Sequence, residues 1–117
     1  MKYNDYNSID LYVDRNLDYY VNFNFGNKFG TNENLILYSN FKCYIRLNQN
    51  APVVAKFTID SDANQLSAGI LSMHLTKNQT ALLVSDTYYF DIVCTNKFNE
   101  TQKLQTGVIN VTPSYSY

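Results

Sequence analysis

The side chains that could do chemistry are few and scattered in this sequence. His74 is the single histidine, and neither a cysteine nor a second histidine stands near it at metal-ligand spacing. Alone it does not form a catalytic triad, which needs a nucleophile and an orienting acid around the base. We therefore expect His74 to be a structural histidine, hydrogen-bonded or exposed, with catalysis as the alternative.

One segment begins like a calcium-binding loop. Asp60, Asp62 and Asn64 alternate as the first ligands of such a loop do. The sixth position, however, is Gln65 instead of glycine, and the twelfth is Leu71 instead of the bidentate glutamate. The sequence therefore predicts a solvated turn here and no metal site.

Two cysteines, Cys43 and Cys94, fall on faces that we expect to point inward from long strands. A disulfide between them is one interpretation. The immunoglobulin disulfide joins different sheets, however, and thiols stay reduced in a cytosol. The N-terminus has no apolar stretch resembling a signal peptide, so we expect cytosolic assembly and two buried free thiols.

The remaining chemistry is sparse. Asp86 and Asp91 flank a predicted strand, but a turn former and a strand residue explain them without a glycosidase pair. The sequence has no glycine-rich phosphate loop, no basic cluster and no run of about 20 apolar residues, and its net charge is −1. We expect no catalytic residue, no metal or other cofactor, no nucleic acid and no membrane as partner, and therefore no enzyme.

Tyrosine is the residue with the most functional promise. The chain has 11 tyrosines, and only 16% of its residues are charged. Tyrosine is enriched at protein interfaces and charged residues are depleted there. About half of the outward tyrosines could simply cover core edges. Seven that fall on the termini or on outward strand faces are interface candidates: Tyr3, Tyr6, Tyr12, Tyr20, Tyr44, Tyr115 and Tyr117.

The elements that position these residues are organised around residues 69–92. Apolar alternation predicts a strand over 70–75, with Thr76 as the N-cap of a helix of about two turns over 77–83. A turn then leads into a second strand, whose inward face is Tyr88, Phe90, Ile92 and Cys94. We expect this helical crossover to carry the chain from one sheet to the other, with both strands near the middle of the domain.

The rest of the chain reads as further short strands separated by turns. Strands are expected over 9–13, 17–25 (with Leu17 on its apolar face), 41–47, 53–60 and 103–111, with a short apolar segment over 35–37 and a polar turn over 61–67. Gly107 inside the last strand predicts a bulge or a close backbone approach. The sequence predicts an all-β, immunoglobulin-like antiparallel β-sandwich of about seven strands over 9–113, with an N-terminal arm (1–8) and a C-terminal tail (114–117).

Three pieces together resemble a known family. They are residues 41–46 (FKCYIR), residues 69–76 (GILSMHLT) followed by Thr80, Leu83 and 88–92 (YYFDI), and residues 107–113 (GVINVTP). In order and spacing they resemble the small immunoglobulin-like sandwich of tailed-bacteriophage virion proteins, found for example at the start of baseplate upper proteins. The chain departs from that pattern at 37–40 (LYSN), where a Leu-Thr-Gly-Tyr-like turn is typical.

The resemblance implies an assembly-forming protein of the virion. On this hypothesis the chain binds in many copies to capsid, neck or tail components, and to copies of itself, after assembly in the host cytoplasm. Tyrosine-rich faces and termini would supply the contact area. The alternative hypothesis is a carbohydrate-binding or host-adhesion module that uses a tyrosine face for stacking.

Overall fold

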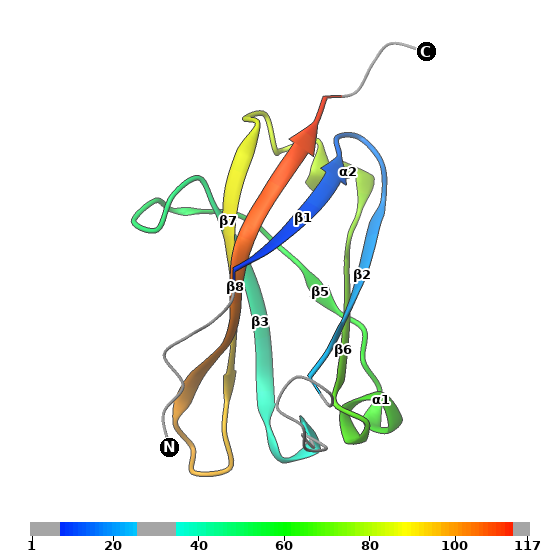
Figure 1. Cartoon of the computed structure of the whole chain (residues 1–117), viewed down its shortest axis with the longest axis vertical. Coiled ribbons are helices and arrows are strands. Elements are labelled where there is room, and N and C mark those ends of the chain that lie inside the picture. The colour runs from blue at the N-terminus through cyan, green and yellow to red at the C-terminus, as the bar shows by residue number, and fades with distance from the viewer. Residues whose placement is uncertain (1–7, 26–34, 114–117) are drawn as a thin grey trace.

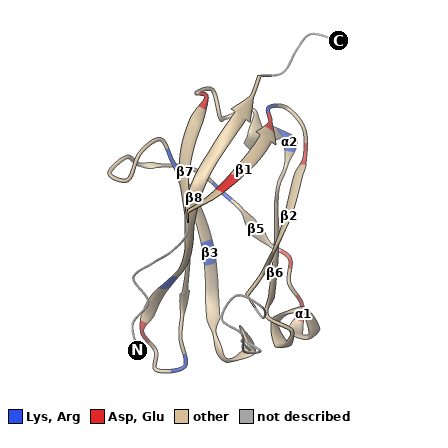
Figure 2. Cartoon of the chain, viewed as in Figure 1, with Lys and Arg blue, Asp and Glu red and all other residues tan. Residues whose placement is uncertain are grey.

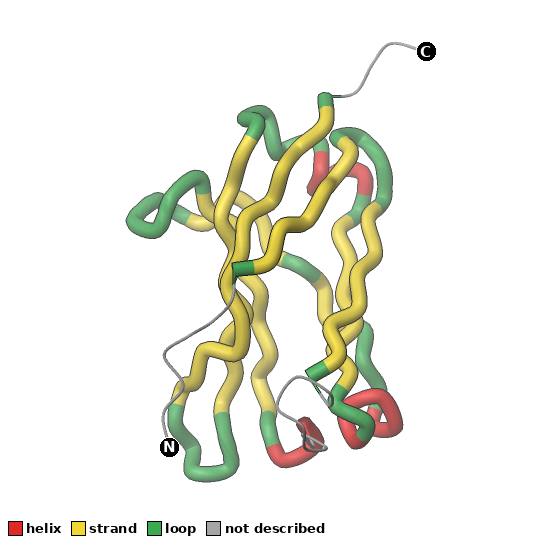
Figure 3. The backbone as a smooth tube through the Cα atoms, in the orientation of Figure 1, coloured by secondary structure: helices red, strands yellow, loops and turns green. Residues whose placement is uncertain are grey.

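The protein is a two-layer β-sandwich, seen in a computed structural model that describes residues 8–25 and 35–113 (Figures 1 and 3). One layer is a five-stranded sheet in the order β1 (Ile9–Asp14), β8 (Thr101–Thr112), β7 (Thr87–Thr95), β3 (Ser39–Arg46) and β4 (Val53–Lys56). The other is a three-stranded sheet in the order β2 (Tyr19–Asn24), β6 (Ile70–Leu75) and β5 (Thr58–Ile59). The predicted all-β immunoglobulin-like sandwich is confirmed.

The strand order is that of an immunoglobulin fold. β2, β6 and β5 correspond to strands B, E and D, and β8, β7 and β3 to G, F and C, with β4 added beside C as in variable-type domains. The first strand departs from the expected antiparallel sandwich, because β1 pairs with β8 in parallel. Two short helices, α1 (Ala63–Ser67) and α2 (Lys77–Thr80), lie in the connections instead of one.

The centre of the core is an aromatic pair in place of the immunoglobulin disulfide. That disulfide links strands B and F, and a buried tyrosine stands two residues before its second cysteine. Here Phe23 of β2 and Phe90 of β7 occupy the positions of the two cysteines. Their ring centroids are 6.1 Å apart and their ring planes are tilted by 44°. Tyr88 precedes Phe90 by two residues, and its hydroxyl accepts a hydrogen bond of 2.9 Å from the Ser85 amide. Packing therefore replaces the covalent link between the sheets.

The predicted crossover is confirmed. β6 is the middle strand of the three-stranded sheet and β7 the middle strand of the five-stranded one. Thr76 is the N-cap of α2, and it and Gln79 form a reciprocal capping box. The helix has one turn instead of two, because the buried Thr80 hydroxyl donates to the Leu17 carbonyl and Leu83 turns into the core.

The predicted strand over 53–60 is wrong as a single element. It divides at Phe57 into β4, in the five-stranded sheet, and β5, in the three-stranded sheet. The Phe57 amide donates to the Cys43 carbonyl at 3.0 Å, so this residue belongs to the crossing point between layers. Alternation alone does not reveal the change of sheet, because it continues unbroken from Ala55 through Phe57 to Ile59.

Three further local predictions need correction. Leu17 does not lie on the apolar face of β2 but in the turn before it, where it is 51% exposed. The polar turn over 61–67 contains α1, capped by Asp62 and Gln65. The apolar segment 35–37 is a single 3-10 turn that buries only Leu35.

Gly107 makes the close approach that the sequence predicts. It lies opposite Ile9 on one side and Phe90 on the other. A Cβ atom at this position would overlap the Ile9 carbonyl oxygen and lie 2.6 Å from Phe90 Cζ. The irregularity in this ladder lies elsewhere, between Ile92 and Val93, so Gly107 serves close packing and not a bulge.

The predicted arm (1–8) and tail (114–117) lie outside the described residues, apart from Ser8. Among the described helices, none has the length and apolar character needed to cross a membrane.

Candidate functional site

The seven candidate tyrosines divide into three groups. Tyr12 and Tyr44 lie on the outer face of the five-stranded sheet, and Tyr20 lies on the outer face of the three-stranded sheet. The other four lie outside the described residues: Tyr3, Tyr6, Tyr115 and Tyr117. The fold therefore places the described candidates on opposite sides of the molecule, and they do not form one continuous patch.

The outer face of the five-stranded sheet carries a group that we call the tyrosine face: Tyr12, Tyr44, Tyr89 and Val108. Tyr12 on edge strand β1 is 68% exposed, and Tyr89 on central strand β7 is 40% exposed. Val108 on β8 pairs with Tyr89, whereas its partner on β1 is Asp10 and Tyr12 lies opposite Asn110. Tyr89 was not among the predicted candidates, although its place between inward Tyr88 and Phe90 marks it as outward.

Two charged residues on this side of the sheet, Arg46 and Asp91, are paired with each other. The Arg46 guanidinium lies over the Tyr44 ring, 5.3 Å from its centroid, and 3.7 Å from the Asp91 carboxylate. A cation above a phenol ring is attracted by the ring's negative face. Asp91 therefore acts as the partner of Arg46, as expected of a structural carboxylate. Other charged side chains border the tyrosine face, because Asp10 lies opposite Val108 and Lys56 lies opposite Tyr44.

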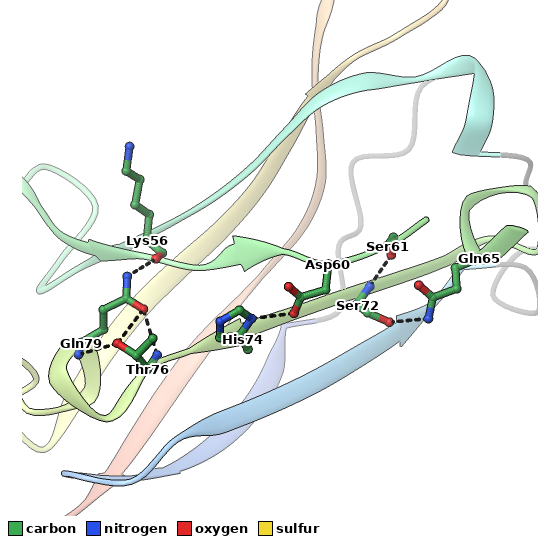
Figure 4. A network of polar contacts seen from close by, with 8 residues as sticks. All are labelled: Lys56, Asp60, Ser61, Gln65, Ser72, His74, Thr76 and Gln79. Carbon is green, nitrogen blue, oxygen red and sulfur yellow. Dashed lines mark hydrogen bonds and ion pairs between the residues drawn. The ribbon is translucent and has the colours of Figure 1, made fainter. Parts of the chain in front are cut away.

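The outer face of the three-stranded sheet carries the second candidate site. Tyr20 of β2 pairs directly with His74 of β6, and their rings stack with centroids 5.2 Å apart and planes 25° apart. His74 Nδ1 lies 2.6 Å from Asp60 Oδ2, the acid that follows β5 (Figure 4). His74 is thus held between an aromatic ring and a carboxylate, which agrees with the expected structural histidine.

Polar side chains continue from this cluster along β6. The Ser61 hydroxyl accepts from the Ser72 amide at 2.6 Å and donates to the Ile70 carbonyl at 3.0 Å. Gln65 Nε2 donates to the Ser72 hydroxyl at 3.1 Å (Figure 4). The side chain of Asp62 accepts from the Gln65 amide as the cap of α1. Ser61, Gln65 and Ser72 thus tie the 60–65 connection to β6.

The calcium-like spacing of Asp60, Asp62 and Asn64 has a structural explanation. The Asp60 carboxylate accepts a hydrogen bond from His74, and the Asp62 carboxylate caps α1, so the two carboxylates do not converge. Within residues 8–25 and 35–113, no group of three or more histidine, cysteine, aspartate or glutamate side chains is arranged to hold a metal ion. The polar connection predicted here contains the helical turn α1 instead of a plain turn.

A groove of about 330 Å³ lies where the chain crosses between the sheets. Its lining includes Phe41, Lys42, Tyr44, Thr58 and Gln79, and neither a carboxylate nor a histidine contributes to it. Gln79 is engaged there through a 3.0 Å hydrogen bond from Nε2 to the Lys56 carbonyl. This groove therefore offers no acid–base pair from its own lining.

Cys43 and Cys94 are free, buried thiols, as expected. Both lie in the five-stranded sheet, β3 and β7, so neither could form the inter-sheet bond of an antibody domain. Burial raises the pKa of Cys94 to about 11. Burial, and secondarily the nearby Asp91 charge, raises the pKa of Cys43 well above its ordinary value. Both thiols are inert structural residues.

A scan of the chain against protein-family models and a search of curated proteins found no match. The class of protein is therefore defined by the fold: an immunoglobulin-like β-sandwich with two differently built outer faces.

Proposed function

We propose that this chain is a non-enzymatic structural protein of a tailed-phage virion. It binds in many copies to capsid, neck or tail components through the tyrosine face. The observation that carries the proposal is the exposure of Tyr12 and Tyr89 on one sheet face, with Val108 beside Tyr89. Burying phenol rings stabilises an interface through apolar area, while each hydroxyl still finds a hydrogen-bond partner.

The charge distribution supports the same function. Lysine, arginine, aspartate and glutamate are spread singly along the described chain, without a patch of one sign (Figure 2). The Arg46–Asp91 pair neutralises the centre of the five-stranded sheet. Charged residues are depleted at the centres of interfaces because desolvating them is costly. A face with exposed tyrosines and a neutralised charge pair near its centre therefore suits burial in an assembly, with Asp10 and Lys56 towards its rim.

The test is incorporation into particles. In the phage that encodes the chain, the number of copies per purified particle is measured by quantitative mass spectrometry. We expect the double variant Tyr12→Ser with Tyr89→Ser to lower incorporation at least tenfold, with folding retained by circular dichroism. Tyr20→Ser is the matched control, because it removes an exposed tyrosine from the other sheet, and we expect it to incorporate normally.

Two results would refute the proposal. One is absence of the wild-type chain from purified particles. The other is equal incorporation of the wild type and the double variant. A further variant lacking residues 1–7 and 114–117 tests the contribution of the four terminal tyrosines, which we expect to add to that of the tyrosine face.

A further inference from the structure

We propose that the outer face of the three-stranded sheet binds a neutral saccharide. The site, which we call the Tyr20 strip, consists of Tyr20, Asn22, Asp60 and His74. It lies on the sheet opposite the tyrosine face, and its ligand is independent of the virion assembly proposed above.

The first argument is the exposed ring of Tyr20. The residue is 71% exposed, although one side of its ring stacks on His74. The opposite side of the ring is consequently open to solvent. A sugar ring presents an apolar face of C–H groups, which pack well on the electron-rich face of an aromatic ring. Tyr20 is therefore a stacking platform that His74 already supports from the other side.

The second argument is the orientation of His74. An ionised carboxylate only accepts hydrogen bonds, so the contact of His74 Nδ1 with Asp60 requires that Nδ1 donate. A sugar on the open side of the Tyr20 ring lies away from His74, so His74 acts as a positioning residue that supports the ring from behind. The Asp60 contact and the Tyr20 stack together hold the ring in one orientation, so little side-chain entropy is lost on binding.

The third argument is the supply of further polar groups beside the ring. Asn22 lies two residues from Tyr20 on the same face, opposite Ser72, and is exposed. Its amide makes no hydrogen bond to the other described residues, and the Asp60 contact to His74 uses only Oδ2. The Asn22 amide thus lies beside the stacking platform, while the Asp60 carboxylate lies on the far side of His74. An aromatic surface with an amide at its edge matches the alternating C–H and hydroxyl groups of a saccharide.

The charge of the strip favours a neutral ligand. Its ionisable groups are Asp60 and His74, and they contact each other. The neighbouring outward residues Thr58 and Ser72 are uncharged, and Asp18, two residues before Tyr20, accepts a 2.7 Å hydrogen bond from the Lys77 amide. An acidic sugar would meet the Asp18 and Asp60 carboxylates without a lysine or arginine in the strip to offset them. A neutral hexose or N-acetylhexosamine chain has no such penalty.

The experiment is a titration of the ¹⁵N-labelled full chain with three probes: cellohexaose, maltohexaose and chitohexaose. We expect at least one of them to shift the amide resonances of Tyr20, Asn22 and His74 in a saturable manner. Tyr20→Ala should weaken that binding at least tenfold, whereas Tyr20→Phe, which keeps the ring, should bind within about threefold of wild type. Tyr12→Ala is the matched control on the other sheet and should bind as wild type does.

The proposal is overturned if none of the three saccharides shifts those resonances, or if Tyr20→Ala binds as tightly as the wild type. Exposed Tyr20 contributes little to the core, so its variants are expected to fold, which thermal unfolding checks. Capture of a peptide or protein by the strip, without saccharide binding, would also refute it. Because incorporation into particles is tested on the opposite sheet, the two proposals succeed or fail separately.

Discussion

Gly107→Ala is the substitution for which the fold makes the sharpest prediction. Gly107 has no positive φ, so alanine fits its backbone conformation. On conformational entropy alone the exchange would stabilise the protein by about 0.4–1 kcal/mol. The added methyl group, however, would overlap the Ile9 carbonyl and the Phe90 ring. Overpacking a filled core typically costs about 1–3 kcal/mol. Since one of the two obstacles is backbone, we expect a steric cost of at least about 3 kcal/mol, the top of that range, which leaves about 2–3 kcal/mol after the entropic gain is subtracted.

The assay is thermal and urea unfolding followed by circular dichroism. At roughly 4 °C per kcal/mol for a domain of this size, the midpoint should fall by about 8–12 °C. Thr106→Ala is the matched control, because Thr106 is the preceding residue of β8 and its side chain faces outward, so we expect a loss of no more than about 1 kcal/mol.

A double-mutant cycle shows whether the Phe90 ring causes the loss of stability in Gly107→Ala. Phe90→Leu shortens the ring that covers Gly107, so Gly107→Ala should cost less in that background, with a coupling energy of about 0.5–3 kcal/mol. If Gly107→Ala is as stable as the wild type, or more stable, the reasoning is wrong and β1 does not pack against β8 as described.

Four other outcomes follow from contacts described above. Cys94 should react with iodoacetamide in the native protein about 100-fold more slowly than an ordinary thiol, because a pKa of about 11 instead of 9 leaves that much less thiolate. Cys43, whose pKa burial raises well above its ordinary value, should also react more slowly, and mass spectrometry of native and urea-unfolded samples measures both rates. An unfolded thiol ionises near pH 9 and folded Cys94 only near 11, so the free energy of unfolding should also fall as the pH rises through that window. Thr76→Ala should lower the free energy of unfolding by about 1 kcal/mol in urea titrations, because it removes the cap of α2, and an unchanged value would contradict the capping role. Tyr88→Phe should cost about 1–2 kcal/mol in the same assay, because it leaves the Ser85 amide without its partner, whereas Tyr89→Phe on the exposed side of β7 should be nearly neutral.

The sequence predicts most of this fold because alternation in β6, β7 and β8 coincides with burial. Leu71, Met73 and Leu75 are all buried, as their spacing requires. The change of sheet at Phe57 cannot be recognised from the local sequence, because Phe57 faces inward with respect to both sheets. The parallel pairing of β1 with β8 is also invisible locally, because it joins residues about 100 positions apart.

The candidate sites were only partly predictable for a related reason. Alternation placed Tyr20 and His74 on outward faces, but their stacking depends on the register between β2 and β6. The contact of Asp60 with His74 depends on β5 joining the other edge of β6. Single-sequence patterns give the face of a residue, whereas partners across strands are set by tertiary pairing.

The parallel ladder between β1 and β8 also determines how the molecule carries mechanical load. The two strands run in the same direction, and their register extends from Ile9 opposite Gly107 to Asp14 opposite Thr112 (Figure 1). Tension that draws Ser8 and Pro113 apart would pull each strand lengthwise against the other. All six residue pairs would then resist shear together, instead of opening one after another as in a zipper. A subunit tethered at both ends would hold its shape until that whole ladder gave way.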